Sequence, residues 1–214
     1  MTGYAQTYGP IQLKRALGWP AWQVDRGLAE GILPGPDFGG SRWTKPVVDG
    51  LLARAAELLA RLGTVPDCGI WKAATYLAER FGGKPQPEAV VELARQRVLR
   101  EAGSYKNHVL YSGRDIEAFT DQTAYERACV DGRQWTREKT AEFLRVRPVD
   151  VRHLERAGLL RPVASLPGRW GSEVMLFRAG DLAALLTDDR VDWEAVRAIP
   201  RGKASPLAEL RAAA

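Results

Sequence analysis

The sequence predicts a mainly α-helical chain with short β-hairpins, in which one structural unit occurs three times in tandem. The first observation is a ten-residue pattern that recurs as VDRGLAEGIL (24–33), VVELARQRVL (90–99) and VRHLERAGLL (151–160). Each copy begins with valine and ends in two aliphatic residues. The second observation is that related segments flank each copy in the same order. A pattern that repeats together with its flanks indicates a repeated structural unit.

A short amphipathic run precedes each decapeptide. Near the start of each decapeptide helix stands a proline, Pro20, Pro87 or Pro148, where a missing backbone N–H costs nothing. Apolar residues recur at helical spacing in each run, so each copy is predicted to open as two helices joined by a tight turn. The three runs are IQLKRAL (11–17), KAATYLAERF (72–81) and TREKTAEFL (136–144).

A glycine-containing segment and then a short apolar run follow each decapeptide, at residues 34–52, 100–119 and 161–186. Two short extended stretches around a Gly-rich tip predict a β-hairpin, and DIEAF and DLAALL predict a closing helix. Helix, turn, helix, hairpin and helix together form a winged helix-turn-helix. We therefore expect three such units and a C-terminal tail, in which the stretch IPRGKASP is mobile. The expected boundaries are 9–62, 66–121, 134–188 and, for the tail, 189–214.

The charge of the chain is compatible with a polyanionic partner. The net charge is +5 and the sequence pI is about 9.4. Residues 1–62 contain 7 basic and 5 acidic side chains, residues 63–133 contain 10 and 10, and residues 134–214 contain 14 and 11. The last segment is thus the most basic, and the middle segment is neutral. A nucleic acid would be expected to bind the last segment first.

The sequence predicts a cytoplasmic location. The chain has two cysteines without paired spacing, and its N-terminus shows no signal-peptide pattern. No apolar stretch approaches the roughly 18 residues that span a bilayer. A cytoplasmic, nucleoid-associated protein is therefore expected, and its Ala-, Arg- and Gly-rich composition is typical of a high-GC bacterium.

Residues 136–186 resemble the MerR and excisionase group of winged-helix DNA-binding proteins. The resemblance rests on TREKTAEFLRVRPVDVRHLERAGLLRP and, after the hairpin, FRAGDLAALL. It implies that the second helix enters the major groove of double-stranded DNA, while the hairpin, or wing, contacts phosphates or the minor groove. MerR regulators continue into a long dimerisation helix, and little after Leu186 corresponds to it. The expected partner is double-stranded DNA, with a second copy of the chain or another DNA-bound protein as further candidates.

Ten residues are predicted to contact DNA. In the third copy Arg147 and Arg152 are expected to read guanine, and Arg156 to bind phosphate. The alternative for Arg152 and Arg156 is a solvated face partly paired with Glu155 and Asp150. In the first copy, Gln23 and Arg26 are expected at the equivalent exposed positions of the second helix, where Gln23 would pair with adenine. The full set is Gln23, Arg26, Arg42, Lys45, Lys106, Arg147, Arg152, His153, Arg156 and Arg169.

The wings are predicted to contribute the remaining contacts. Arg42, Lys45 and Arg169 are expected at wing tips, where basic side chains meet phosphate. The neighbouring Trp43 and Trp170 either anchor the wing on its core or stack on nucleic acid. In the middle copy two carboxylates, those of Glu88 and Glu92, are expected on the second helix and would repel phosphates. That copy would therefore act through its wing, at Lys106, Asn107 and His108, or serve as a spacer or protein-contact module.

The sequence favours a function without catalysis. It contains no phosphate-binding glycine loop, no HExxH and no Gly-x-Ser-x-Gly motif. Its only two histidines, His108 and His153, lack the cysteine or carboxylate cluster of a zinc site, so no metal or cofactor is expected. We expect a transcriptional regulator, or an accessory factor in excision, partition or replication of a mobile element. The alternative is a protein-interaction scaffold built from winged helices.

Overall fold

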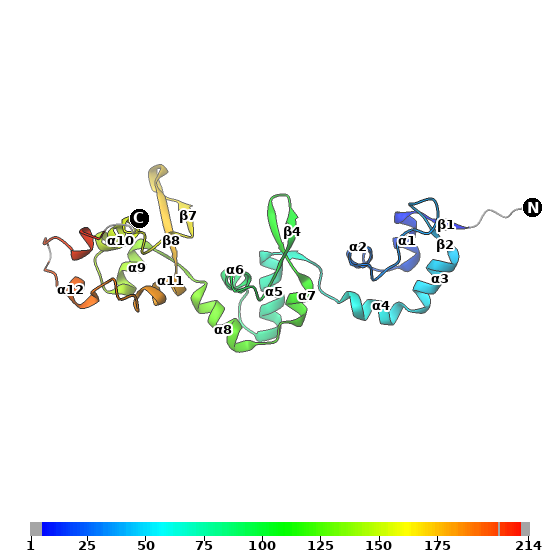
Figure 1. The fold of residues 1–214 in the computed structure, drawn as a ribbon, viewed down its shortest axis with the longest axis horizontal. Coiled ribbons are helices and arrows are strands. Elements are labelled where there is room, and N and C mark those ends of the chain that lie inside the picture. The colour runs from blue at the N-terminus through cyan, green and yellow to red at the C-terminus, as the bar shows by residue number, and fades with distance from the viewer. Residues whose placement is uncertain (1–5, 201, 211–214) are drawn as a thin grey trace, which may run out of the picture. The chain divides into compact units, whose positions relative to one another are not determined.

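The computed structural model describes residues 6–200 and 202–210, without the side chain of Trp170. Within this part of the chain there are twelve α-helices and three small antiparallel sheets (Figure 1). The prediction of a mainly α-helical chain with short β-strands is thereby confirmed. Contacts divide the chain into two compact units. The N-terminal unit contains residues up to Ala73 and Leu99–Phe119, and the C-terminal unit contains Ala74–Val98 and the chain from Thr120 onward.

The N-terminal unit contains six helices or parts of helices and five short strands. In chain order they are β1 (Thr7–Tyr8), α1 (Pro10–Leu17), α2 (Ala21–Ala29), β2 (Trp43–Thr44), α3 (Lys45–Ala53), α4 (Ala55–Leu62), β3 (Cys68–Gly69), the start of α5 (Ile70–Phe81), β4 (Glu101–Tyr105), β5 (His108–Tyr111) and α7 (Gly113–Ala118).

The C-terminal unit contains the rest of α5 and one three-stranded sheet. Its other elements are α6 (Pro87–Arg95), α8 (Gln122–Asp131), β6 (Gln134–Thr136), α9 (Arg137–Leu144), α10 (Pro148–Arg156), β7 (Ala164–Pro167), the 3-10 turn η1 (Arg169–Gly171), β8 (Glu173–Arg178), α11 (Ala179–Leu185), α12 (Trp193–Arg197) and the 3-10 turn η2 (Pro206–Ala208).

One order of elements occurs twice in full. Strand, helix, helix, strand, strand and helix follow one another from β3 to α7 and again from β6 to α11. Both sheets pair the first strand with the third, in the orders β3-β5-β4 and β6-β8-β7. The hairpins β4–β5 and β7–β8 each extend away from the helices of their unit (Figure 1). The sequence patterns did not predict the first strand of either sheet.

The first copy follows the same order but lacks a full hairpin. Phe38 and Arg42 form a single antiparallel bridge across a turn in which Gly39 and Gly40 have positive φ of 55° and 71°. The next residues, Trp43 and Thr44, form β2 and pair with β1 instead. The expectation of a two-stranded wing in this copy is therefore wrong. The chain reverses direction at Gly39 and Gly40, and the residues after Arg42 pair with β1 and do not extend a hairpin.

The decapeptide places its apolar positions in the cores. Its first residue is fully buried in every copy, and its tenth is at most 2% exposed. At the fourth position of the first copy, a Cβ on Gly27 would lie 2.6 Å from Leu33 Cγ and 3.1 Å from Leu62 Cδ2. Glycine therefore allows α2 to pack closely against both leucines. The residues at positions one and ten are Val24, Val90 and Val151, and Leu33, Leu99 and Leu160.

The C-terminal tail packs on the third copy. Val196 of α12 and Leu207 of η2 are buried in the same apolar cluster as Leu154 and Phe177. Ser205 is 5% exposed and caps η2 through its hydroxyl, which accepts from the Leu207 N–H at 3.3 Å. Ser205 and the apolar anchor Leu207 thus fix the end of this stretch on the third copy. The expectation that the stretch IPRGKASP is mobile stays a prediction.

Candidate nucleic-acid interface

Helix α10 of the third copy presents a basic face to solvent. Val151 and Leu154 are fully buried, and helical periodicity places Pro148, Val149, Arg152 and Arg156 on the opposite side. All four are exposed. We call these four residues the outward face of α10. The predicted exposure of Arg152 and Arg156 is confirmed.

The two carboxylates of α10 are bound by other residues and do not neutralise this face. Glu155 accepts from Arg137 Nε at 2.9 Å, and Asp150 accepts from Arg147 Nε at 2.9 Å. Among the described residues, Arg152 has neither a hydrogen bond nor an ion pair; its charge merely contributes the weakest of several effects that lower the pKa of Glu138. Arg152 is therefore available to a ligand, and the alternative of pairing with Glu155 and Asp150 is wrong.

His153 holds Arg156 on the flank of this face. The guanidinium Nη2 of Arg156 contacts Nδ1 of the half-buried His153. Burial and the positive charge of Arg156 lower the pKa of His153 below its ordinary value, which favours the neutral imidazole over the charged form. His153 therefore lies beside Arg156 and helps to orient it, and the DNA contact expected for His153 stays a prediction.

Arg147 is the N-cap residue of α10, and its guanidinium is engaged in hydrogen bonds within the protein. Its Nε and Nη2 donate to the two oxygens of Asp150 at 2.9 and 3.0 Å, and its Nη1 donates to the Lys203 carbonyl at 2.9 Å. Asp150 is fully buried and also accepts from the Arg147 backbone N–H at 3.0 Å. The guanidinium is thus engaged by the capping carboxylate and the tail, and the expectation that Arg147 reads bases is not supported by its geometry.

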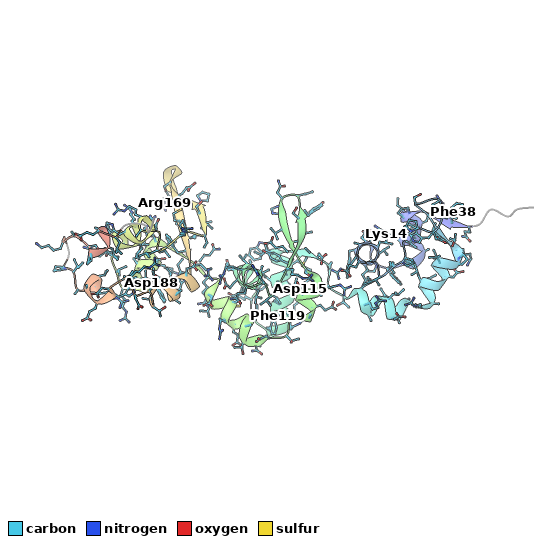
Figure 2. The ribbon with its side chains drawn as sticks, in the orientation of Figure 1. Lys14, Phe38, Asp115, Phe119, Arg169 and Asp188 are labelled. Atoms are coloured by element: carbon cyan, nitrogen blue, oxygen red, sulfur yellow. The ribbon has the colours of Figure 1, made fainter. Side chains whose placement is uncertain are left out.

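The β7–β8 hairpin bears Arg169 in its connecting turn. Arg169, labelled in Figure 2, is exposed and begins η1. Its carbonyl accepts from the Ser172 hydroxyl at 2.7 Å. Among the described residues its guanidinium has no hydrogen-bond partner. Arg169 therefore lies at a wing tip, as predicted. The prediction for the Trp170 side chain lies outside the described residues.

Two further exposed arginines of the third copy were not predicted. Arg145 lies in the turn between α9 and α10 with φ 57° and ψ 46°, and Arg161 follows the decapeptide. A non-glycine residue in the left-handed region is uncommon, and such positions are frequent at functional sites. Their sequence position gives a signal that the prediction did not use. Arg145 lies in the turn just before the second helix and Arg161 just after the decapeptide, and the segments that flank the second helix lie beside its outward face.

The second helix of the first copy presents no cation at the equivalent positions. The outward positions of α2 are Ala21, Trp22, Asp25 and Ala29, which correspond to the outward face of α10 counted from Val24 and Val151. Asp25 forms an ion pair with Lys14 of α1 at 2.6 Å. The outward side of α2 therefore combines apolar residues with one carboxylate that is already paired, and it offers no cation to a phosphate.

Gln23 and Arg26 are buried, which overturns their prediction as exposed DNA contacts. Gln23 is 7% exposed, and its Nε2 donates to the Gly63 carbonyl at 2.7 Å. Arg26 is 8% exposed; it donates to the carbonyls of Leu62 and Val65 and to Asp67 Oδ1 at 2.8–3.0 Å. Both side chains satisfy the backbone that follows α4. They hold the end of the first copy in place.

Arg42 and Lys45 are also bound within the first copy. Arg42 is half-buried, and its guanidinium donates to the Thr7 hydroxyl at 2.8 Å and to the Thr7 carbonyl at 3.1 Å. Lys45 begins α3 and pairs with Asp49 one turn later at 2.6 Å, so it does not lie at a wing tip. Trp43 is 3% exposed and donates to the Pro34 carbonyl at 2.9 Å, which anchors the short wing.

The middle copy combines an exposed wing tip with a second helix that has a buried carboxylate. Lys106 and Asn107 form the β4–β5 turn with φ of 49° and 65°, the pair of positive values typical of a type I′ hairpin. Lys106 therefore lies at a wing tip, as predicted. The outward positions of α6 are Pro87, Glu88, Val91 and Arg95, and they are mixed in charge.

Glu92 does not lie on the outward side of α6, contrary to the prediction. Its side chain is 1% exposed and accepts from Arg95 at 2.7 Å, from Gln96 at 2.7 Å and from Arg178 at 2.7 Å. Arg178 precedes α11 and also binds Asp181. The carboxylate thus links the second helix of the middle copy to the closing helix of the third.

The buried carboxylates predict how stability depends on pH. Burial favours the neutral forms of Glu92 and Asp150, but hydrogen bonds from Arg95, Arg178 and Arg147 outweigh it and hold both pKa values below their ordinary range. A depressed pKa stabilises the fold above the unfolded value and is lost as pH falls through the folded value. We expect the free energy of unfolding to fall steeply below about pH 4.5, where unfolded carboxylates protonate.

Urea denaturation at a series of pH values measures this dependence. The double variant Glu92→Gln/Asp150→Asn, compared at each pH, should be less stable at pH 7 and should show a shallower decline in acid. An acid decline as steep in the variant as in the unchanged chain would rule out these two groups as its source.

Comparisons of the chain with known proteins found no similar protein. No family model, no curated protein and no solved structure matches the chain. Within residues 6–200 and 202–210, no helix is both long and apolar enough to cross a membrane.

Proposed function

We propose that the chain binds double-stranded DNA through its third copy, with α10 in the major groove and the β7–β8 wing on phosphate. The proposal takes the repeated order of strand, helix, helix, hairpin and helix as a tandem winged helix-turn-helix architecture. The resemblance of residues 136–186 to the MerR and excisionase group supports it. Transcriptional regulation, or an accessory role in moving or maintaining a mobile element, is the corresponding biological function.

One observation carries the proposal: among three equivalent helices, only α10 exposes two arginines without carboxylate partners. The outward face of α10 contains Arg152 and Arg156, whereas α2 presents Asp25 and α6 presents Glu88 at its outward positions. An arginine without a carboxylate partner can donate two hydrogen bonds to guanine O6 and N7, or bind a phosphate. We therefore assign DNA contact to the third copy alone, which narrows the expectation that the first and third copies both read DNA.

Arg169 tests the role of the wing. Replacing Arg169 by alanine removes one positive charge from the wing tip, so affinity should fall on every duplex sequence by a similar factor, about 3- to 10-fold. The salt dependence of log K should become shallower by about one. Fluorescence anisotropy with several unrelated duplexes measures both quantities.

Arg190 provides the matched control for the wing. It is exposed in the same unit but is paired with Asp188 at 2.6 Å, so Arg190→Ala should leave affinity nearly unchanged. A loss confined to one duplex sequence would reassign Arg169 to base contact. An unchanged affinity in Arg169→Ala would remove the wing from the interface.

The first two copies fit a second role, that of protein-interaction modules. Their outward helix positions contain Trp22 and Val91 together with the carboxylates Asp25 and Glu88. These surfaces disfavour phosphate and suit a polypeptide partner. The scaffold alternative is therefore proposed for these copies, next to DNA binding by the third.

A further inference from the structure

An apolar groove lies beside the wing of the middle copy. It has a volume of about 610 Å³ and is formed by β3, the first turn of α5 and the β4–β5 hairpin, all within the N-terminal unit. Ile70, Val109 and Leu110 contribute aliphatic lining. The groove is large enough for one or two bulky side chains of a partner.

Two aromatic side chains border this groove with most of their surface exposed. Trp71 is 68% exposed and Tyr105 is 62% exposed, and both line the groove. Exposed aromatic residues that surround an apolar concavity are typical of binding hot spots, since they provide large contact areas at low cost in conformational entropy. An isolated exposed aromatic residue would need no explanation, but two of them on one groove indicate a docking surface.

The charges around the groove are positive. Lys72 lines it, and Lys106 lies next to it with Nζ 5.3 Å from the centre of the Tyr105 ring. Among the described residues that line the groove, none is acidic. The occupant is therefore expected to be anionic as well as apolar.

A peptide fits these features better than a nucleic acid does. A strand of nucleic acid needs a basic surface that follows its backbone over several phosphates, whereas residues 63–133 contain 10 basic and 10 acidic side chains. A short acidic peptide needs only a few local cations and a pocket for its apolar side chains. We propose that this groove docks an acidic segment of a partner protein that inserts leucine or aromatic side chains between Trp71 and Tyr105.

Selection of peptides tests the proposal. Short random peptides displayed on phage are selected against the full chain, and their affinities are measured with variants. We expect selected peptides that combine Asp or Glu with Leu, Phe or Trp. Trp71→Ala should weaken them by about tenfold or more, and Lys106→Glu by about 3- to 10-fold.

Matched controls keep the result specific. Ile11 is also 68% exposed in the N-terminal unit, and Lys84 is an exposed lysine elsewhere, so Ile11→Ala and Lys84→Glu should leave peptide affinity unchanged. Selected peptides without acidic residues, or peptides that bind Trp71→Ala normally, would overturn the proposal. So would a failure to select any peptide, or binding of a short oligothymidine strand that Trp71→Ala abolishes. Arg152→Ala should leave peptide binding intact, which separates this result from the outcome for DNA.

Discussion

Replacing Glu92 by alanine is expected to lower the free energy of unfolding by about 3 kcal/mol, because it leaves the charge of Arg178 without its buried partner. The Glu92 side chain is 1% exposed, and that of Arg178 is 14% exposed. Arg178 retains Asp181, which limits the loss. Urea denaturation monitored by circular dichroism measures the change in the C-terminal unit.

Glu88 provides the control for this prediction. It lies one turn earlier on α6 and is exposed, so Glu88→Ala should change stability by less than about 0.5 kcal/mol. Glu92→Gln keeps the size of the side chain and part of its hydrogen bonding, and it should fall between the two. Equal stabilities for Glu92→Ala and Glu88→Ala would show that the linkage to Arg178 contributes nothing.

The second large effect is expected on DNA affinity. The double variant Arg152→Ala/Arg156→Ala should weaken binding to a selected duplex by about 2–4 kcal/mol, or roughly 30- to 700-fold. Both arginines lie on the outward face of α10, where each can bind a guanine or a phosphate. They are one turn apart, so their effects need not add. Fluorescence anisotropy with a duplex selected from random sequences gives the affinities.

The same selection distinguishes base contact from phosphate contact. If Arg152 reads a base, Arg152→Ala should relax the preference at one position of the selected site, and Arg156→Ala should lower affinity on all sites alike. Uniform losses in both variants would assign both arginines to phosphate. Circular dichroism should show an unchanged helix content in both, because the two side chains are exposed.

Sequence periodicity correctly predicted which side of the second helix is buried, but it did not predict which segments pack against the other sides. The decapeptide pattern identified Val151 and Leu154 as core residues, and the positions opposite them, Arg152 and Arg156, are exposed as predicted. A helix with a regular apolar face determines its own inward side. What covers the remaining sides depends on segments that are distant in the chain.

Arg26 illustrates why the candidate site of the first copy could not be predicted. It looked exposed because its position on α2 lies away from Val24, yet it is bound by carbonyls 36 and 39 residues further along. A side chain that satisfies the backbone of a distant turn has no signature in local periodicity. Its only sequence signal is Asp67, a carboxylate 41 residues away, which is too remote to pair by pattern.

The small strands were missed for a related reason. β1 and β3 contain two residues each, too few for the alternation that identifies a strand. β3 forms because the last strand of the β4–β5 hairpin leaves an edge with unpaired backbone groups, which the segment before α5 satisfies. β1 pairs in the same way with the short strand β2. The order β6-β8-β7 is therefore a consequence of tertiary packing, even though the hairpin itself could be predicted.

A salt titration tests whether the third copy binds duplex DNA through its exposed arginines. Anisotropy of a labelled duplex should be measured from about 50 to 200 mM salt for the unchanged chain, Arg152→Ala/Arg156→Ala and Arg15→Ala/Arg61→Ala. The last variant removes the same charge from exposed residues of the first copy. We expect affinity to fall with salt, to collapse in the α10 variant and to change little in the control. Equal losses of affinity in the two variants, or binding that does not depend on salt, would contradict DNA binding through Arg152 and Arg156.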